Sequence, residues 1–499
     1  MPESNGRSVP EKEDDMETSL KKLIKEITVK AVHGPLDKDI PSVEYDSRKV
    51  APGAMFVAVR GTQTDGHKHI AGATAQGAKC VVLEEMPAVT VPSVTYIEVP
   101  DSSAALAEIA SAFYGHPSRS LKLTGVTGTN GKTTTATLLY DLFTSFGYAC
   151  GLLSTVVNKI AGRELPATHT TPDPLELNRL LVQMTDAGCE FCFMEVSSHA
   201  VVQNRVRGLH FAGGIFTNLT HDHLDYHKTF AEYLKAKKGF FDILPASAFA
   251  LVNIDDKNGP VMQQNCPAHR RTYSLRNKAD YHCRIIEPHM DGMLLEINGP
   301  QLWVQFIGRF NAYNLLAVYG AAVELGASKD EVLTAMSTLK PVAGRFECIR
   351  SADGRLSIVD YAHTPDALQN VLATINELKG GGQVITVVGC GGDRDNAKRP
   401  VMARIAAEMS GRVILTSDNP RTEDPAQILR QMEDGLDAVL RPKALTIADR
   451  REAIRTAVAL AAPGDIILIA GKGHEPYQEI NGIRHHFDDR QQVAEAFDR

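Results

Sequence analysis

The residues best suited to chemistry form a loop of glycine, lysine and hydroxyl side chains in the first third of the chain. An apolar run at residues 121–127 enters this loop, and the segment after it repeats its apolar residues at helical spacing. In such a strand, loop and helix, backbone N–H groups bind phosphate oxygens, the lysine neutralises the β and γ phosphates, and a hydroxyl reaches Mg²⁺. We therefore expect an ATP site formed by Gly128, Thr129, Asn130, Gly131, Lys132, Thr133 and Thr134.

The loop departs from the general phosphate-loop signature at one position. That signature places a glycine five residues before Gly131, where Val126 stands, and Gly125 comes one residue too early. A glycine turn that binds no nucleotide therefore stays open as an alternative when the loop is considered alone.

Acidic and histidine side chains follow two later apolar runs. Glu195 ends the run at residues 191–194, and ligands collect at the carboxyl ends of strands in such sheets. Residues 217–227 are dense in His, Asp, Asn and Thr. Zinc would need three or four converging His or Cys ligands, whereas beside a phosphate loop the oxygen-preferring Mg²⁺ is favoured. For Glu195 alone, a salt-bridged strand end is the alternative.

Lys237 lies on a predicted helix over residues 229–241 and shares a face with Tyr233. Lys235 and Lys238 are close in the sequence, and a run of charged residues usually forms a solvated helix face. Considered alone, Lys237 would therefore be assigned to the solvated face.

Three segments position these residues. Residues 20–118 alternate short β-branched runs with alanine-rich stretches, residues 119–342 contain the phosphate loop, and residues 343–499 alternate buried strands with helices. Alternating strands and helices imply right-handed βαβ units and a parallel sheet. We predict an α/β protein of three domains: a small mixed α/β amino-terminal domain, a central P-loop ATPase domain with a parallel sheet, and a Rossmann-like carboxy-terminal domain.

Composition excludes several classes of protein. The formal net charge of the 499 residues is -7, which gives no general basic field for nucleic acid, and no apolar run approaches the length of a membrane helix. Residues 1–19 are polar and acidic, unlike a secretory signal, and suggest a mobile tail. The eight cysteines show no metal or disulfide spacing. We expect a monomeric, cytoplasmic enzyme that acts on small molecules.

Several motifs together carry a resemblance to a known family. They are, in chain order, residues 128–134, Glu195-Val-Ser-Ser-His199, Asn218-Leu-Thr-His-Asp-His223-Leu-Asp225, Tyr233-Leu-Lys-Ala-Lys237, Asn253-Ile-Asp-Asp256 and Gly308-Arg-Phe-Asn311-Ala-Tyr-Asn314. In order and spacing the chain resembles the Mur ligases, which use ATP to join an amine to a carboxylate. Thr-Asn-Gly-Lys-Thr-Thr is typical of that family and accounts for the displaced glycine.

The resemblance implies roles for individual residues. Lys132 and Thr133 would hold the triphosphate and its metal, Glu195 and His223 would bind Mg²⁺, and Asn311, Asn314 and Arg345 would complete the ATP site. Lys237 occupies the position of the carbamylated lysine of the family, and its carbamate would be an anionic ligand for a second Mg²⁺. His363 would orient the phosphate or the acid, although a structural histidine is an equal alternative.

Two further groups of residues match substrate-binding positions of the family. The UDP-sugar and dipeptide group consists of Tyr45, Ser47, Thr62, Gln63, Thr64, Thr170, Thr171, Ser197, Gln203 and Arg205. His169 stands where some relatives have Asn. The amino-acid group consists of Arg394, Asp418, Asn419, Pro420, Arg421, Gly471 and Glu475.

The Asp418-Asn-Pro-Arg421 motif looks like that of the members that take meso-diaminopimelate. A guanidinium pairs with the distal carboxylate that lysine lacks. Without its neighbours, the motif would be an ordinary surface turn. We expect a ligase that adds meso-diaminopimelate to the D-Glu γ-carboxylate of UDP-N-acetylmuramoyl-L-Ala-D-Glu. An L-lysine-adding relative, a folylpolyglutamate synthetase and a catalytically silent scaffold are the alternatives.

Overall fold

The computed structural model describes residues 18–61, 64–167, 169–220 and 224–498. These residues divide into two compact units. The first contains the described residues up to Ser120 together with Pro172–Thr185 and Val202–Leu209. The second contains Leu121–Thr171, Asp186–Val201 and the described residues from His210 onward.

The first unit is built on a five-stranded sheet in the order β2-β7-β6-β5-β4, in which only β2 is antiparallel to its neighbour. Its elements are β1 (Thr18–Ser19), α1 (Leu20–Lys25), β2 (Ala31–His33), β3 (Asp39–Ile40), β4 (Val43–Glu44), β5 (Met55–Val57), α2 (Ile70–Ala75), β6 (Cys80–Leu83), β7 (Thr95–Glu98), α3 (Ser102–Phe113) and nearly all of α5 (Pro174–Asp186). Thr18 and Ser19, which the sequence placed in the tail, pair with β3.

An eleven-stranded sheet forms the centre of the second unit, in the order β11-β10-β9-β12-β8-β13-β14-β15-β16-β17-β18. The strands are β8 (Lys122–Thr127), β9 (Cys150–Leu153), β10 (Val157–Ile160), β11 (Arg163–Pro166), β12 (Phe191–Glu195), β13 (Gly213–Phe216), β14 (Phe249–Asn253), β15 (His269–Ser274), β16 (Tyr281–His289), β17 (Gly292–Ile297) and β18 (Gln301–Val304). Every pairing from β9 across to β16 is parallel, and both outer parts are antiparallel.

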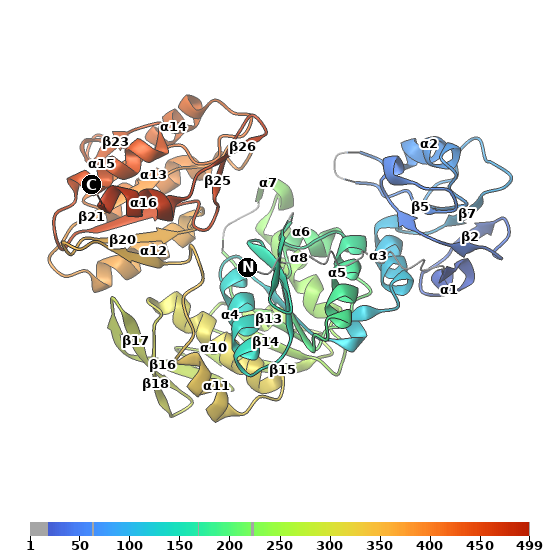
Figure 1. Ribbon diagram of the computed structural model, residues 1–499, viewed down its shortest axis with the longest axis horizontal. Helices are drawn as coiled ribbons and strands as arrows, with labels where there is room; N and C mark the ends of the chain where they lie inside the picture. Colours follow the sequence, from blue (N-terminus) through green and yellow to red (C-terminus); the bar gives the residue numbers. More distant parts are fainter. Residues whose placement is uncertain (1–17, 62–63, 168, 221–223, 499) are drawn as a thin grey trace, which may run out of the picture. The chain divides into compact units, whose positions relative to one another are not determined.

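Helices cover this sheet (Figure 1). They are α4 (Lys132–Ser145), α6 (Ser198–Val202), α7 (Leu224–His227), α8 (Phe230–Asp242), α9 (Gly259–Met262), α10 (Arg309–Glu324) and α11 (Lys329–Met336). Helix α4 packs on β8, β9 and β12 because its apolar residues recur on one face, where Leu138, Leu139 and Leu142 are fully buried. Helix α8 begins where the Thr229 hydroxyl accepts the Glu232 N–H, as in a capping box.

The carboxy-terminal part of the second unit has a six-stranded sheet in the order β19-β20-β24-β21-β22-β23, parallel except for β19, and a separate hairpin of β25 and β26. Its elements are β19 (Glu347–Arg350), β20 (Leu356–Asp360), α12 (Pro365–Leu378), β21 (Val384–Val388), α13 (Lys398–Met409), β22 (Arg412–Leu415), α14 (Pro425–Glu433), β23 (Ala444–Thr446), α15 (Arg450–Leu460), β24 (Ile466–Ala470), β25 (Tyr477–Ile480), β26 (Ile483–His486) and α16 (Asp489–Phe497).

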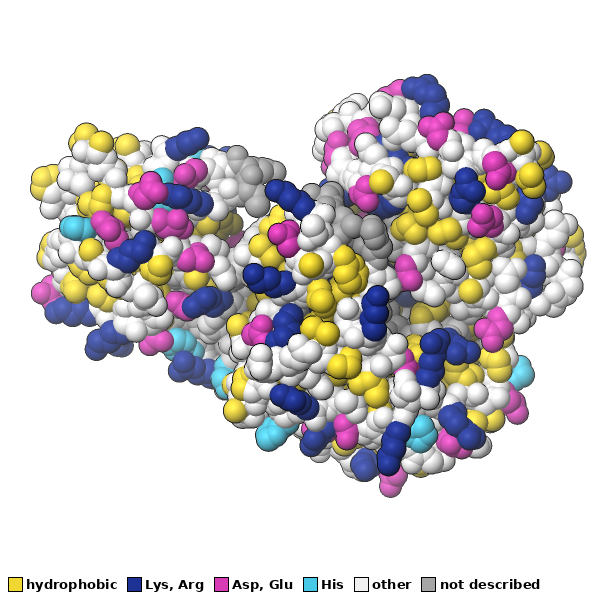
Figure 2. All heavy atoms as spheres, turned by 180° about the vertical axis from the view of Figure 1, so that it is seen from behind, with side chains coloured by type: hydrophobic (Ala, Val, Ile, Leu, Met, Phe, Trp, Pro, Cys, Tyr) yellow, Lys and Arg dark blue, Asp and Glu magenta, His cyan; other side chains and the backbone are white. Residues whose placement is uncertain are grey.

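The predicted fold class is confirmed, since each of the three expected regions has its own sheet and helices. The antiparallel outer strands of the central sheet are an addition to the parallel sheet expected there. Among the residues described, no helix has the length and apolar content needed to cross a bilayer. On the face drawn in Figure 2, acidic and basic side chains are interspersed.

Candidate functional site

Two glycines of the loop between β8 and α4 leave no room for a side chain, one against Thr217 after β13 and the other against Asn314 of α10. Gly128 has φ 152° and Gly131 has φ 88°. A Cβ on Gly128 would lie 1.9 Å from Thr217 Oγ1, and a Cβ on Gly131 would lie 2.5 Å from Asn314 Oδ1. The displaced glycine, Gly125, has a different use, because a Cβ there would lie 2.5 Å from the Phe240 ring of α8. It lets α8 pack directly on β8.

Two lysines meet at one carbonyl of this loop. The Gly128 oxygen accepts from Lys132 Nζ at 2.9 Å and from Lys237 Nζ at 2.7 Å. Lys132 also donates to the Thr129 carbonyl, at 2.8 Å. Lys237 is only 1% exposed, so its assignment to a solvated helix face is wrong, and its Nζ lies 4.7 Å from the centre of the Tyr233 ring. The predicted phosphate lysine and the predicted carbamate lysine therefore lie together.

Oxygen ligands converge at the start of α4. Thr133 Oγ1 donates to Glu195 Oε1 at 2.9 Å, and the same carboxylate oxygen accepts the Thr155 N–H at 2.8 Å. Glu195 is 1% exposed at the end of β12. Arg345 Nη2 donates to Thr133 Oγ1 at 3.1 Å and so brings a third basic side chain to the loop, after Lys132 and Lys237. A hydroxyl beside a carboxylate fits Mg²⁺, which prefers oxygen ligands.

His223, one of the predicted Mg²⁺ ligands, lies outside the described residues, as do its two preceding residues. Among the described residues, no group of three or more His, Cys, Asp or Glu side chains could hold a metal ion. The described residues thus supply two of the predicted metal ligands, Thr133 and Glu195, side by side.

The predicted adenine residues lie on the first turns of α10. Asn311 and Asn314 are both buried, and Asn314 Nδ2 donates to Asn311 Oδ1 at 3.3 Å. Asn130 of the loop donates to Asp366 Oδ2 at 2.9 Å. Burial raises the pKa of Asp366, while the hydrogen bond from Asn130 opposes the rise. Neither Asp366 nor Thr155 was identified from the sequence, because each acts through a partner distant in the chain.

His363 lies between β20 and α12. Its Nδ1 is 2.9 Å from the Tyr361 carbonyl oxygen, and its own carbonyl accepts from Lys398 at 3.0 Å. Two residues earlier, Asp360 accepts the N–H groups of Phe346 and Ala362. Burial raises the pKa of Asp360 to about 6, against the opposing effects of the Arg345 charge and those N–H groups.

The Asp418-Asn-Pro-Arg421 loop is held by its backbone. Arg421 has φ 52°, its N–H donates to the Glu479 carbonyl at 3.0 Å, and its carbonyl accepts the Asn481 N–H at 2.7 Å. Its guanidinium reaches the loop that follows β21, where Nη1 donates to the Gly392 carbonyl at 2.7 Å. The hairpin of β25 and β26 therefore sets the direction of the arginine. Arg394, which is exposed, follows in the same loop as Gly392.

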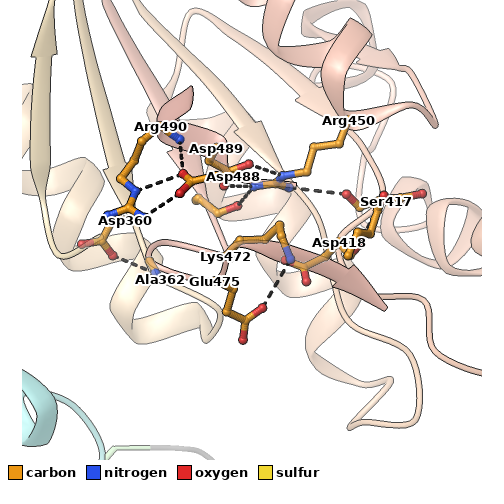
Figure 3. A network of polar contacts seen from close by, with 12 residues as sticks. Asp360, Ala362, Ser417, Asp418, Arg450, Lys472, Glu475, Asp488, Asp489 and Arg490 are labelled. Atoms are coloured by element: carbon orange, nitrogen blue, oxygen red, sulfur yellow. Dashed lines mark hydrogen bonds and ion pairs between the residues drawn. The ribbon is translucent and has the colours of Figure 1, made fainter. Parts of the chain in front are cut away.

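A buried lysine completes this pocket and was not identified from the sequence. Lys472 is 0% exposed, and its Nζ donates to Asn419 Oδ1 at 3.1 Å and to Glu475 Oε2 at 3.3 Å. Asn419 Nδ2 donates to the same Glu475 oxygen at 2.8 Å. Burial raises the pKa of Glu475, the Asp418 charge adds to the rise, and Lys472 opposes it. Figure 3 shows Asp418, Lys472 and Glu475 facing one another.

Gly471 allows the two strand ends to meet. It has φ 117°, and a Cβ there would lie 2.5 Å from Asp418 Oδ2. The predicted amino-acid residues Asp418, Asn419, Arg421, Gly471 and Glu475 therefore form one cluster, at the carboxyl ends of β22 and β24. Pro420 contributes its carbonyl to the floor of the cluster, since a Cβ on Gly392 would lie 1.9 Å from that oxygen.

The predicted UDP-sugar residues are distributed over both units. Within the first, Tyr45 hydrogen-bonds Asp173, and Arg205 donates to Gln203 Oε1 at 2.7 Å through Nη2. Burial and the Asp173 carboxylate raise the pKa of Tyr45 to about 12, while the Arg205 charge opposes the rise. These contacts associate three of the predicted residues, Tyr45, Gln203 and Arg205, with Asp173.

The other described members of this predicted group each contact different residues. Ser47 begins a 3₁₀ turn capped by the Asp46 carboxylate, and Thr64 Oγ1 lies 3.3 Å from His69 Nε2. Thr62 and Gln63 lie outside the described residues. In the second unit, Thr171 Oγ1 donates to the Glu195 carbonyl at 2.8 Å and accepts the Ser197 N–H, while Thr170 accepts from Thr155. His169, beside Thr170, is exposed.

His474 gives a test of the geometry that is independent of catalysis. Burial, with the charges of Arg345, Arg490 and Lys472, lowers the pKa of His474 to about 3. Its Nδ1 is buried, and no described residue offers that atom a hydrogen bond. In the unfolded chain His474 takes up a proton as pH falls through about 6.5, whereas in the folded chain it stays neutral until about pH 3. The contribution of neutral His474 to the free energy of unfolding is therefore present above pH 6.5 and is lost as pH falls toward about 3.

We therefore expect the stability advantage of the wild type over His474→Leu to shrink by about 1.6 kcal/mol between pH 6.5 and pH 5. Urea unfolding of both proteins at the two pH values measures this difference. An advantage that does not change with pH would show that His474 titrates normally in the folded state.

Three family models match the chain. They are the Mur ligase family catalytic domain over residues 39–114, the Mur ligase middle domain over residues 126–322, and the Mur ligase glutamate ligase domain over residues 344–473.

Curated and solved proteins match over nearly the full length. A Bacteroides thetaiotaomicron protein named UDP-N-acetylmuramoyl-L-alanyl-D-glutamate–2,6-diaminopimelate ligase is 58% identical and covers 96% of this chain and 99% of its own length. A Phocaeicola vulgatus protein with the same name shows the same identity and coverage. A solved structure of a ligase of that name has a TM-score of 0.68, 35% identity, and covers 97% of this chain and 99% of its own.

Proposed function

This chain belongs to the Mur ligase family of ATP-dependent ligases, and on that premise we propose that it adds meso-diaminopimelate to UDP-N-acetylmuramoyl-L-Ala-D-Glu. The D-Glu γ-carboxylate attacks the γ phosphate of ATP, giving an acyl phosphate and ADP, and the amine of diaminopimelate then displaces phosphate. The reaction is a step of peptidoglycan precursor synthesis. The observation that carries the amino-acid assignment is the Arg421 guanidinium, which the Gly392 carbonyl holds in the loop that also carries Asp418 and Asn419.

The first half of the reaction brings an anionic carboxylate to an anionic phosphate, so positioning and charge neutralisation supply most of the catalysis. Lys132 and Arg345 are the cations placed at the loop, and the loop N–H groups bind the phosphate oxygens. Thr133 and Glu195 would hold Mg²⁺, which when bound neutralises charge on the β and γ phosphates. Asn311 and Asn314 would bind the adenine end.

Lys237 acts, in this proposal, as a carbamate. Its burial beside the Gly128 carbonyl, which it shares with Lys132, supports the assignment. A nearby like charge disfavours the protonated form of an amine, and the neutral amine is the form that reacts with CO₂. The carbamate would be an anionic oxygen ligand for a second Mg²⁺, and His223 would be a further ligand of the metal site.

The second half of the reaction needs the amino acid to be held by both ends. Arg421 and Arg394 bind the distal carboxylate, and Asp418 and Glu475 accept hydrogen bonds from the ammonium group. Asn419 has its side chain engaged by Lys472, Glu475 and the Glu479 N–H, so it acts by positioning Glu475. The predicted UDP-sugar and dipeptide residues of each unit would bind that substrate, and His363 would orient the acid. We propose that this takes place in the cytoplasm, with a monomer.

Selectivity for the amino acid tests the proposal. The wild type should use meso-diaminopimelate far better than L-lysine, with a preference on the order of 10⁴, because lysine leaves the two guanidiniums without a carboxylate. Arg421→Ala should lower kcat/KM for diaminopimelate, by an amount that corresponds to roughly 2 to 5 kcal/mol of lost transition-state stabilisation. Its use of lysine should stay poor, since Arg394 still repels the lysine ammonium. Measuring kcat/KM for both amino acids with both proteins gives the answer.

Arg430→Ala is the matched control, since Arg430 is an exposed arginine of the same region that pairs only loosely with Asp424, at 3.7 Å. It should behave as the wild type. A wild type that prefers lysine, or an Arg421→Ala protein with unchanged selectivity, would overturn the substrate assignment. Incubation with folate and glutamate separates the folylpolyglutamate alternative, and ATP binding without substrate-dependent ADP release would support a silent scaffold.

A further inference from the structure

A fully buried ion pair lies directly behind the amino-acid pocket. Arg450 begins α15, Asp489 begins α16, and both side chains are 0% exposed. Arg450 Nε donates to Asp489 Oδ1 and Nη2 donates to Oδ2, both at 2.8 Å. Asp489 lies beyond residue 473, where the last family match ends. The pair joins the final helix of the chain to the pocket region.

The same guanidinium also donates to two backbone carbonyls of the pocket loops, and Figure 3 labels one of these residues, Ser417. Arg450 Nη2 donates to the Ala470 oxygen at 3.0 Å, and Nη1 donates to the Ser417 oxygen at 3.5 Å. Ala470 directly precedes Gly471, and Ser417 directly precedes Asp418. One planar, rigid group therefore spans the ends of two strands at the residues next to the pocket.

The two strand ends lie so close together that there is no room for a larger residue between them. Gly471 leaves no room for a Cβ beside Asp418, and Glu475 follows four residues later in the same loop. Burial alone would lower the pKa of the Arg450 guanidinium, but the charges of Asp489, Asp418 and Glu475 raise it. The guanidinium thus stays charged behind two pocket carboxylates, and a small shift of either loop changes how far apart those carboxylates lie.

Stability is a weak explanation for such a pair. The free energy needed to remove two charges from water is nearly as large as the free energy gained from their attraction. Well-packed apolar residues of similar volume usually stabilise a folded protein equally well. A lysine in place of Arg450 would keep the charge, but its single nitrogen could not reproduce the fork that reaches both strands.

We propose that Arg450, fixed by Asp489, is a positioning residue that sets the separation of Asp418 from Gly471 and Glu475 and thereby the affinity for the incoming amino acid. The inference rests on the proposed function, because that function assigns the pocket to the amino acid. It gives the carboxy-terminal helix α16 a part in substrate binding although α16 supplies no residue of the pocket.

The test compares three variants with the wild type. Arg450→Lys keeps the charge, Asp489→Asn keeps the shape, and Arg450→Met combined with Asp489→Leu removes both charges so that neither is left buried alone. We expect KM for diaminopimelate to rise about tenfold or more in all three, with KM for ATP and for the UDP-dipeptide within about twofold of wild type. A merely structural pair would leave every KM of the double variant at its wild-type value.

The matched control is the pair of Arg355 and Asp353. It has the same forked contact, with Nε and Nη2 on the two carboxylate oxygens, and Arg355 Nη1 donates to the Val458 carbonyl at 2.9 Å. It lies before the start of β20, at the amino ends of the parallel strands, whereas the pocket lies at their carboxyl ends. Arg355→Met combined with Asp353→Leu should leave the three KM values unchanged.

Hydrogen exchange keeps the inference separate from the proposed function. In the folded double variant, amides of residues 416–421 and 470–475 should exchange faster than in the wild type, whereas those of residues 121–134 should not. Unchanged protection in both pocket segments would overturn the inference, as would an unchanged KM for diaminopimelate or an equal rise of all three KM values. A wild type that ligates no diaminopimelate would reject the proposed function, and the exchange result would still decide the role of Arg450.

Discussion

Replacing Lys132 with alanine should lower ATP turnover by on the order of 10³-fold while the protein stays folded. The triphosphate loses the point charge that the loop places against it, and the remaining cation, Arg345, approaches from the Thr133 side. The structural cost is small, since Lys132 is half-buried and donates to the Gly128 and Thr129 carbonyls of its own loop. We expect the unfolding free energy to change by about 1 kcal/mol.

Substrate-dependent ADP release and thermal unfolding measure the two effects. Lys122→Ala is the control, because Lys122 is an exposed lysine at the start of the same strand, β8, whose Nζ donates to the Leu325 carbonyl at 3.3 Å. It should keep full activity. Near-normal turnover in Lys132→Ala would remove the phosphate-loop assignment.

The second large effect is expected at Lys237. Lys237→Ala should lose ligation by on the order of 10² to 10³-fold, and acetate or another small acid should partly restore it, because the missing group is a carboxylate-like oxygen. Lys237→Arg should stay inactive, since arginine cannot form the carbamate. The buried position of the side chain leaves space for a small acid when it is truncated.

Ligation assays of both variants with and without acetate test this expectation. Lys235→Ala is the control on the same helix, because Lys235 is exposed. If Lys237→Arg preserved activity, the lysine would be acting as a cation and the carbamate assignment would be wrong.

Local patterns were sufficient for the elements that position the site. The apolar runs at residues 121–127 and 191–194 are the strands β8 and β12, with bounds that differ by one residue, because buried parallel strands are short and continuously apolar. The antiparallel outer strands were missed. In β16, for example, most residues are partly exposed, so the run lacks the continuous apolar character of a buried strand.

Contacts of the site between residues far apart in the sequence could not be predicted from local patterns. Arg345 and Thr133 are 212 residues apart, and Arg450 and Asp489 are 39 apart, so no local spacing connects them. Lys472 could not be identified from the sequence, because a lysine between two glycines gives no indication that its side chain is buried. Gly125 was read as a misplaced phosphate glycine, whereas the contact that requires it is with Phe240 on a different element.

The engaged side chain of Asn419 has a consequence for inhibitors. Its oxygen accepts from Lys472 and from the Glu479 N–H, its amide donates to Glu475, and the residue is 3% exposed. A compound that aims an amide or hydroxyl at Asn419 must first break contacts that hold the pocket together, and it should gain little affinity from doing so. Affinity is better sought with an anionic group directed at Arg421, where a guanidinium offers a charged, forked donor to the incoming molecule.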